Sequence, residues 1–314
     1  MFRVGIVAPS MLSLVLAAVC SGCARPTKTD PTATAVPHRL TVPEFQALSF
    51  SPPDHRHAYG ESASQFGELR IPSGPGPHPT VVLIHGGCWK APYSVLRELG
   101  PLADALKADG IATWNIEYRR LDEPGSGWPG TFLDVGRALD HLREIANEYR
   151  LDLDRVVLVG HSAGGHLAMW ASGRDRLPAD SQLYTADPLP VRGVINLVGT
   201  MDMTDNIENM QARCRDTVVT RMLGGAPREV PQRYAQASAM GLVPLGVPQR
   251  LIWGEHEEFV PGEVAQKYLA AATRAGDDVQ ISIVPGMGHF DLASPHTDAW
   301  PVLRSSIRDM MGRP

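Results

Sequence analysis

Three kinds of side chain in this sequence have the types and the chain order that nucleophilic catalysis requires. Ser162 lies at the centre of Gly160–Gly164, which reads G-H-S-A-G, and His289 follows the last apolar run. Between them, Gly254–Pro261 carries several acidic residues. A serine hydroxyl is a weak nucleophile at neutral pH, so it needs a histidine base, and the histidine needs an orienting carboxylate. The order serine, acid, histidine therefore indicates acyl-transfer chemistry with Ser162 as nucleophile and His289 as base.

The acid has three candidates in the loop that follows the apolar run Gln249–Trp253. Glu255, Glu257 and Glu258 all lie there. One carboxylate is needed beside the imidazolium that forms during proton transfer, whereas the others would only solvate the loop. The residues alone leave the choice between them open.

The glycines around Ser162 predict a nucleophile elbow, a sharp turn from a strand directly into a helix. Such a turn brings backbone segments so close together that Cβ atoms would obstruct it, which explains glycine at 160 and 164. The preceding run Arg155–Val159 is typical of a buried parallel strand, and Ala163–Ser172 continues as a helix.

A second glycine-rich loop, His85–Trp89, reads H-G-G-C-W and follows the apolar run Thr80–Ile84. Acyl transfer needs backbone N–H groups aimed at the developing oxyanion, and consecutive glycines expose such groups without side-chain obstruction. We expect the N–H groups of Gly87 and Cys88, together with that of Ala163 beside the nucleophile, to form an oxyanion hole.

The elements that must position these residues alternate between apolar runs and helical patterns, which is typical of an α/β fold with a mostly parallel central sheet flanked by helices. Strands are predicted at Thr80–Ile84, Ile111–Glu117, Arg155–Val159, Val191–Val198, Gln249–Trp253 and Gln280–Val284, with an antiparallel pair within Arg56–Ile71. Helices are predicted near Val95–Ala108, Phe132–Tyr149, Ala163–Ser172, Pro261–Ala275 and Asp298–Met311. Met201–Gln236 breaks this rhythm and is predicted to form a small lid over the site.

In combination these motifs resemble the α/β-hydrolase superfamily, and within it the esterases and kynurenine formamidases with an H-G-G-x-W loop, often labelled BD-FAE-like. The resemblance covers residues 50–312 and rests on His85–Trp89, Gly160–Gly164, the acidic loop and His289. It implies an α/β-hydrolase fold. In such proteins the acid stands four residues before the proline of a D-x-x-V-P pattern, which falls on Glu257. This sequence departs from the pattern by having glutamate there.

The resemblance also implies supporting roles for neighbouring residues. Glu117–Arg120 matches a Tyr-Arg pair that braces the oxyanion loop in these families rather than touching substrate. Trp89 and Trp128 are candidates to line an acyl pocket, and a purely structural place in the core is the alternative for each, because tryptophans are mostly buried.

The sequence therefore predicts a serine hydrolase that cleaves carboxylic esters through an acyl-enzyme, with a small-molecule ester or amide as substrate and with no metal or cofactor. One alternative is an amidase or arylformamidase that uses the same residues on a C–N bond. Another is a noncatalytic binding protein on a hydrolase fold, which the complete set of catalytic residues disfavours. Substrate identity and oligomeric state are not encoded in these motifs.

Composition is that of an ordinary globular protein, with 43% hydrophobic and 20% charged residues among 314. A net charge of -5 without a basic run argues against nucleic acid or an anionic membrane surface as the main partner. No linker divides the chain after residue 50, so residues 49–314 are expected to form one catalytic domain.

The N-terminus is predicted to be an export signal. Residues 1–22 contain one early arginine and an apolar run, and small residues precede Cys23, as in a bacterial lipoprotein signal. Acylation of Cys23 would anchor the protein to a membrane facing the periplasm or exterior, and an ordinary secretory signal is the alternative. Residues 23–48 are expected to form a flexible tether.

Two cysteines, Cys88 and Cys214, lie in the catalytic region. Their separation in the sequence says nothing about their distance in space. We expect free buried thiols, and a disulfide between them is the alternative that an exported protein would permit.

Overall fold

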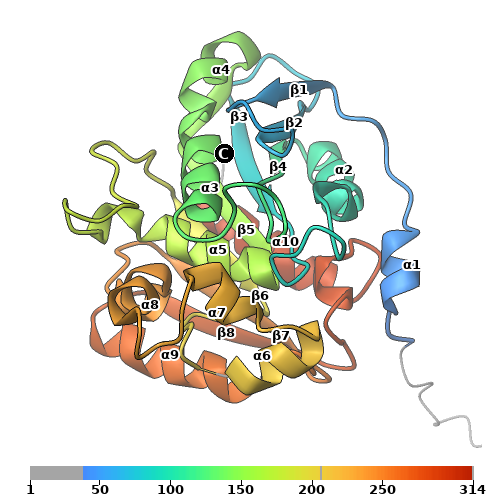
Figure 1. Cartoon of the computed structure of the whole chain (residues 1–314). Coiled ribbons are helices and arrows are strands. Elements are labelled where there is room, and N and C mark those ends of the chain that lie inside the picture. The colour runs from blue at the N-terminus through green and yellow to red at the C-terminus, as the bar shows by residue number, and fades with distance from the viewer. Residues whose placement is uncertain (1–37, 206, 313–314) are drawn as a thin grey trace, which may run out of the picture. The chain divides into compact units, whose positions relative to one another are not determined.

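The computed structural model describes residues 38–205 and 207–312, whose centre is an eight-stranded sheet in the order β1-β2-β4-β3-β5-β6-β7-β8 (Figure 1). The strands are β1 His55–Ala58, β2 Phe66–Arg70, β3 His78–Ile84, β4 Ala112–Ile116, β5 Leu151–His161, β6 Gly193–Leu197, β7 Gln249–Gly254 and β8 Val279–Val284. β2 pairs antiparallel with both β1 and β4, and every pairing from β4 to β8 is parallel. The carboxyl ends of six parallel strands therefore meet at one edge of the sheet.

Helices follow the strands in the manner of crossover connections. They are α1 Val42–Gln46, α2 Gly100–Ala108, α3 Gly130–Asp140, α4 Leu142–Tyr149, α5 Ala163–Ser172, α6 Ile207–Cys214, α7 Val218–Leu223, α8 Pro231–Ala237, α9 Gly262–Arg274 and α10 Ala299–Met311. Short 3-10 turns lie at Leu96–Leu99, Arg174–Arg176, Ala239–Gly241 and Asp291–Ala293.

Helices cover both faces of the sheet because successive crossover connections step in opposite directions along the strand order. The step from β3 to β4 runs toward β1, whereas the later steps run toward β8. Right-handed crossovers therefore place α2 on one face and α3, α4, α5 and α9 on the other. The last helix, α10, joins α2, because Arg304 on α10 pairs with Asp109 at the end of α2.

The central strands are apolar on both faces, as a sheet covered on both sides requires. Val81 to Ile84 on β3 and Val156 to Val159 on β5 are completely buried. This packing fixes β5 in the middle of the sheet. The last residue of β5 is His161, so the residue that follows it, Ser162, is held rigidly at the carboxyl edge of the sheet.

All the predicted strands and helices are found, with ends that shift by a few residues. The antiparallel pair is β1 and β2, and the long predicted helix at 132–149 is divided into α3 and α4. Residues 201–236, called the cap segment below, contain the short helices α6 and α7 and all but the last residue of α8 in place of the regular rhythm.

The predicted tether is wrong in its last part. From His38 onward the chain packs on the catalytic domain: α1 buries Phe45, and the Leu40 N–H donates to the Asp291 carboxylate at 2.9 Å. The expectation rested on the Pro- and Thr-rich composition, which one buried aromatic residue overrides. The predicted signal, Cys23 and the first part of the tether lie outside the described residues.

In the described ranges, none of the helices combines the length and the apolar character needed to cross a membrane.

Candidate active site

Ser162 occupies a strained turn between β5 and α5. Its backbone has φ 54° and ψ −119°, and it precedes the first turn of α5. A Cβ on Gly160 would lie 2.1 Å from the Gly164 carbonyl oxygen, and one on Gly164 would lie 2.0 Å from that of Ile84. Only glycine fits at these two positions. The predicted elbow is therefore present, and it presents the Ser162 side chain at the carboxyl edge of the sheet.

His289 lies on the loop after β8 and is oriented by Glu257 on the loop after β7. Nδ1 of His289 lies 2.9 Å from each of the two Glu257 carboxylate oxygens. Both side chains are almost fully buried, with 6% and 3% of their surface exposed. The carboxylate also accepts the Phe259 N–H at 2.6 Å and the Val260 N–H at 3.0 Å. Glu257 is thus held by its own loop, and with Nδ1 as donor the other ring nitrogen is left as a base.

The other two acid candidates point elsewhere. Glu258 is exposed and lies 3.2 Å from the Arg213 guanidinium, and Glu255 accepts the Gly286 N–H at 2.8 Å. Neither contacts His289 in the described structure. The geometry therefore separates Glu257 from its neighbours, as the family pattern had indicated.

His161, the residue before Ser162, supports the backbone of His289. Its Nε2–H donates to the His289 carbonyl oxygen at 3.0 Å, and the two rings lie 4.8 Å apart. Burial, and then the neighbouring His289 ring, lower the pKa of His161 to about 3. A neutral His161 therefore links the end of β5 to the histidine loop.

The loop His85–Trp89, called the HGG loop below, has an unusual backbone. Gly87, Cys88 and Trp89 have φ angles of 93°, 54° and 55°. Among the described residues, the N–H groups of Gly87, Cys88 and Ala163 donate no hydrogen bond to protein atoms. These N–H groups are free to bind an anionic oxygen beside Ser162.

A buried ionic network holds the HGG loop from below. His85 Nε2 lies 2.8 Å from the Glu117 carboxylate, and His85 Nδ1 lies 3.0 Å from the Gly86 carbonyl oxygen. Burial alone would raise the pKa of Glu117, but His85, Arg120 and the Leu96 N–H together hold it below its ordinary value. The ionised Glu117 therefore fixes both the ring of His85 and the start of the loop.

The residues after Glu117 complete this brace. The Tyr118 hydroxyl donates to the His85 carbonyl oxygen at 2.8 Å, and its ring stacks on the imidazole at 4.5 Å. Arg120 donates to the Ser94 carbonyl oxygen at 2.6 Å. These contacts agree with the prediction that this segment braces the loop.

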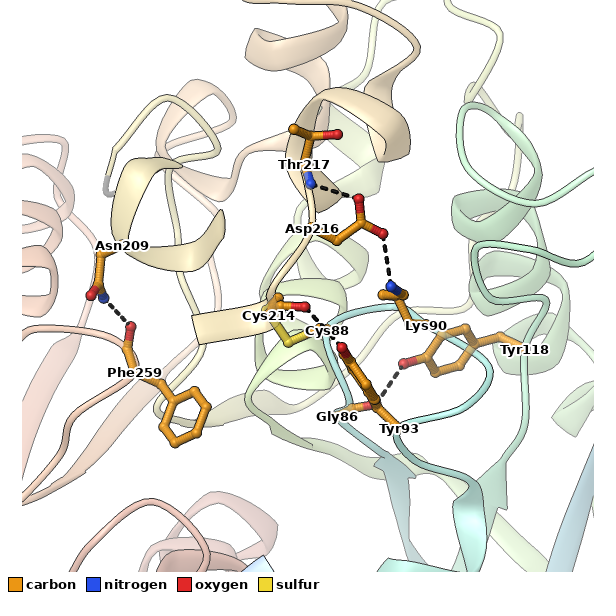
Figure 2. Close-up of a disulfide and its surroundings, with 10 residues drawn as sticks. All are labelled: Gly86, Cys88, Lys90, Tyr93, Tyr118, Asn209, Cys214, Asp216, Thr217 and Phe259. Atoms are coloured by element: carbon orange, nitrogen blue, oxygen red, sulfur yellow. Dashed lines mark hydrogen bonds and ion pairs between the residues drawn. A yellow bond between two sulfur atoms is a disulfide. The ribbon is translucent and has the colours of Figure 1, made fainter. Parts of the chain in front are cut away.

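Cys88 and Cys214 form a disulfide, so the expectation of free thiols is wrong. Figure 2 shows that the bond joins the HGG loop to the end of α6, with Tyr93 and Lys90 reaching across beside it. The Tyr93 hydroxyl donates to the Cys214 carbonyl oxygen at 3.0 Å, and Lys90 pairs with Asp216 at 2.7 Å. The separation of 126 positions in the sequence gave no indication of this proximity.

Two cavities meet at Ser162. The smaller has a volume of about 30 Å³ and the larger about 280 Å³. His289 lines only the larger one. Trp89 lines the smaller one, whereas Trp128 lines neither and packs on Phe132 with ring centroids 5.7 Å apart. Of the two tryptophans, only Trp89 lines a cavity that Ser162 also lines.

A BD-FAE family model matches residues 70–271, more than half of the chain. The chain belongs to the BD-FAE family.

Relatives of this BD-FAE protein are esterases and formamidases. Esterase LipC of Mycobacterium tuberculosis is 28% identical over 92% of this chain and 68% of its own length. A kynurenine formamidase of Meyerozyma guilliermondii is 34% identical over 30% of this chain and 33% of its own length. A solved structure, a truncated carbohydrate esterase from gut microbiota, superposes with a TM-score of 0.70 at 21% identity, over 83% of this chain and 97% of the other. The fold is that of α/β-hydrolase esterases, and the protein is a carboxylic ester hydrolase.

One part of the BD-FAE site was missed in the sequence, and another was predicted only as a segment. The missed part is α1, which contributes Val42, Phe45 and Gln46 to the large cavity. The other is α6, which lies within the predicted lid 201–236 and contributes Arg213 to both cavities. A signal for α1 exists: Thr41 and Glu44 have the spacing of a capping box, with Pro43 in the first turn. The Thr41 N–H does donate to the Glu44 carboxylate, at 2.9 Å. No comparable signal marks the position of α6.

His166, on α5 of the BD-FAE elbow, has a structural place. Its Nε2–H donates to the Ala237 carbonyl oxygen at 2.8 Å, and burial lowers its pKa to about 4. The ring packs edge-on against Trp89. Among the residues that the structure describes, no group of three or more His, Cys, Asp or Glu side chains is arranged to hold a metal ion.

Proposed function

We propose that this protein cleaves carboxylic esters through an acyl-enzyme on Ser162, with His289 as general base and acid and Glu257 as the acid that orients it. The observation that carries the proposal is the pair of 2.9 Å contacts between Glu257 and His289 Nδ1, made by two almost fully buried side chains, of which His289 lines the large cavity together with Ser162. Such a pair keeps the second imidazole nitrogen available for the serine proton.

In acylation, Ser162 Oγ attacks the ester carbonyl carbon and its proton moves to His289 Nε2. The carbonyl oxygen becomes an oxyanion, which the N–H groups of Gly87, Cys88 and Ala163 stabilise. The bond to the alcohol oxygen then breaks, and His289 returns the proton to that oxygen. An alcohol leaves, and the acyl group stays on Ser162.

In deacylation, a water molecule takes the place of the alcohol. His289 accepts a proton from the water as it attacks the acyl carbon, and it then protonates Ser162 Oγ as the acyl bond breaks. The carboxylic acid leaves. In the described structure Ser162 Oγ has no protein hydrogen-bond partner; nucleophile–base contacts in unliganded sites are often long and tighten when substrate is bound.

The experiment that tests this mechanism replaces Ser162 with alanine. Ser162→Ala should abolish hydrolysis of p-nitrophenyl acetate and labelling by a fluorophosphonate probe, while the thermal unfolding curve stays close to that of the parent. Ser172→Ala, a buried serine at the end of α5, serves as the control and should keep labelling. Equal labelling of the Ser162 variant would contradict the mechanism.

Amide hydrolysis on the same residues is the second candidate, favoured by the formamidase among the relatives. The same acylation would break a C–N bond and His289 would protonate the departing amine. Assay of N-formylkynurenine beside p-nitrophenyl acetate separates the two activities. A higher kcat/KM for the formamide would make this the principal reaction.

We also propose that the protein is exported and anchored through acylated Cys23. The disulfide supports export, because such bonds persist mainly in oxidising compartments. Cys23→Ser should move the protein from the membrane fraction to the soluble fraction, since loss of the acyl chains removes most of the membrane affinity. A parent protein that is already soluble after secretion would contradict the anchor and favour an ordinary signal.

A further inference from the structure

The two cavities at Ser162 differ in what lies beside them. His289 and Phe290 line the large cavity but not the small one, and Ala163 and Trp89 line the small cavity but not the large one. In the proposed mechanism the leaving oxygen must lie beside His289, because this residue protonates it. The carbonyl oxygen points to the N–H groups of the HGG loop, so the rest of the acyl group has to extend away from His289. The small cavity is therefore the acyl side, and the large cavity is the alcohol side.

The acyl side has little room and firm walls. Its volume of about 30 Å³ holds about two water-sized groups, since one such group needs roughly 10–15 Å³. Trp89, Met210 and Val260, each at least nine-tenths buried, form its walls. An acetyl methyl or a propionyl ethyl group matches this space, whereas a butyryl chain exceeds it.

The wall that Met210 forms is fixed from both directions. α6 is tied to the HGG loop by the Cys88–Cys214 disulfide. It is tied to the acid loop, residues 254–261, by Asn209 Nδ2, which donates to the Phe259 carbonyl oxygen at 2.6 Å (Figure 2). Because both sides of the site hold the same helix, α6 cannot easily withdraw to admit a longer acyl chain.

The alcohol side is larger, and one of its walls comes from α1. Its aromatic lining residues are Phe45, Tyr93, Phe259 and Phe290, and its charged ones are Glu98, Arg213 and Arg215. Phe45 is 2% exposed and lies 5.6 Å from the Phe290 ring and 6.0 Å from the His161 ring. α1 is tied to both flanks of the site: the Leu40 N–H reaches Asp291, and Gln46 Nε2 donates to Glu98 at 2.9 Å. The helix therefore spans from the histidine loop to the segment after the HGG loop.

We propose that the site accepts esters of short acyl groups, acetyl or propionyl, with a bulky aromatic alcohol, and that α1 selects the alcohol while α6 limits the acyl chain. This inference rests on the proposed function, because it uses His289 to assign the leaving side. It assigns specificity to two segments outside the catalytic residues, Met210 on α6 and Phe45 on α1.

The test measures kcat/KM for two substrate series. The first varies the acyl group of p-nitrophenyl esters from acetate through propionate and butyrate to hexanoate. The second varies the alcohol of acetates from ethyl to phenyl to 2-naphthyl and is followed by proton release. The parent should favour acetate over butyrate by at least about tenfold, since a misfitting methylene costs on the order of 10-fold or more in kcat/KM.

Two variants should change the two series separately. Met210→Ala should raise the butyrate-to-acetate ratio by about tenfold and leave the alcohol preference unchanged. Phe45→Ala should lower the ratio of 2-naphthyl to ethyl acetate by about tenfold and leave the acyl preference unchanged. Ratios of variant to parent remove the intrinsic reactivity of each ester from the comparison.

Matched controls are available in the same segments. Met222→Ala removes a buried methionine of the cap segment that lines neither cavity, and Phe50→Ala removes a phenylalanine that packs on Gly100. Neither control should change the butyrate-to-acetate ratio or the 2-naphthyl-to-ethyl ratio of kcat/KM. If Met210→Ala fails to fold, Val260→Ala enlarges the same cavity from the acid loop.

The outcomes separate the inference from the proposed function. A parent that hydrolyses hexanoate as well as acetate, or ratios that Met210→Ala and Phe45→Ala leave unchanged, would overturn the inference while Ser162→Ala still abolished activity. Activity that survives in Ser162→Ala would overturn the proposed function itself.

Discussion

The HGG loop and the acid loop lie on either side of Ser162 and are held in place by different means. The HGG loop depends on residues from elsewhere: Glu117 and Tyr118 hold His85, the Leu121 N–H donates to the Trp89 carbonyl oxygen at 2.6 Å, and Cys214 holds Cys88. In the acid loop, the Glu257 carboxylate is held by N–H groups of the loop itself. The loop backbone is held by Trp253, whose Nε1–H donates to the Val260 carbonyl oxygen at 2.9 Å, and by Asn209 of α6.

This difference follows from what each loop presents. The HGG loop presents backbone N–H groups, and their direction can be set only by fixing the whole chain from outside. The acid loop presents a side chain, whose rotamer two neighbouring N–H groups can fix locally. A change of the acid-loop side chain should therefore remove the orientation of His289 completely. A change around the HGG loop should instead lower activity and stability together.

The largest effect is expected for Glu257→Gln, which keeps the size of the side chain but removes its charge. The histidine would lose the partner that fixes its tautomer and stabilises its protonated form, so kcat should fall on the order of 10⁴-fold. Steady-state kinetics with p-nitrophenyl acetate measures the loss. The neighbouring Glu258→Gln removes an exposed carboxylate and should stay within about twofold of the parent, consistent with the small worth of surface pairs. A severe loss in Glu258→Gln with normal activity in Glu257→Gln would reverse the assignment.

Glu117→Gln is expected to lower kcat less than Glu257→Gln does, but to lower the stability of the fold as well. Loss of the buried carboxylate removes the charged partner of His85 Nε2 and leaves Arg120 with Glu123 as its carboxylate partner, which should destabilise the fold by several kcal/mol. The HGG loop should shift, so kcat should fall by about 10- to 100-fold with KM little changed, because the oxyanion contacts act mainly in the transition state. Glu123→Gln, which also removes a partner of Arg120 but does not touch His85, is the control. Equal kcat losses in both variants would show that the contact between Glu117 and His85 is not what maintains kcat.

The pH dependence of stability separates the support of the HGG loop by Glu117 from the support of the histidine loop by His161. Folded His161 takes up a proton only near pH 3, whereas the unfolded ring does so near pH 6.5. Between these values the unfolded chain binds more protons, so stability is lost as the pH falls, by about 2 kcal/mol from this ring between pH 7 and pH 5. Glu117 contributes its loss only below its ordinary value of about 4.3, since its pKa is lowered. Urea unfolding at pH 7, 6 and 5 should give a shallower pH slope for His161→Gln than for the parent, and identical slopes would contradict this account.

The smallest effect is expected for Tyr118→Phe, which removes one hydroxyl from the HGG brace. The His85 carbonyl oxygen loses one hydrogen bond, so the free energy of unfolding should fall by about 1 kcal/mol and kcat by a few-fold. Thermal melts and kinetics measure both. An activity loss as large as that of Glu117→Gln would mean that Tyr118, rather than the buried charge, holds the loop.

The parts of the site that could be predicted are those encoded within a few neighbouring residues. Gly160, Ser162 and Gly164 are adjacent in the elbow, and the HGG loop directly follows its strand, so the steric and electronic requirement is visible in the sequence. The strands were predictable because their apolar runs alternate regularly with helical patterns. The choice of Glu257 came from the family pattern, and its geometric reason, the two backbone N–H groups that hold it, needed the structure.

The parts that could not be predicted depend on contacts between distant segments. Cys88 and Cys214 are 126 residues apart, and nothing in either neighbourhood indicates the other. Phe45 lies in a composition typical of a tether, and its burial depends on Phe290 and His161, more than a hundred residues away. The cavity walls, and with them the expected specificity, therefore lie outside what the motifs encode.

The disulfide also closes a long covalent loop. The segment between Cys88 and Cys214 contains β4, β5, the elbow and β6. In the chain-entropy model, a crosslink over a loop of this length restricts the unfolded chain and stabilises the folded state by about 4–5 kcal/mol. The bond that shapes one wall of the site therefore also acts on the unfolded chain of the whole central sheet.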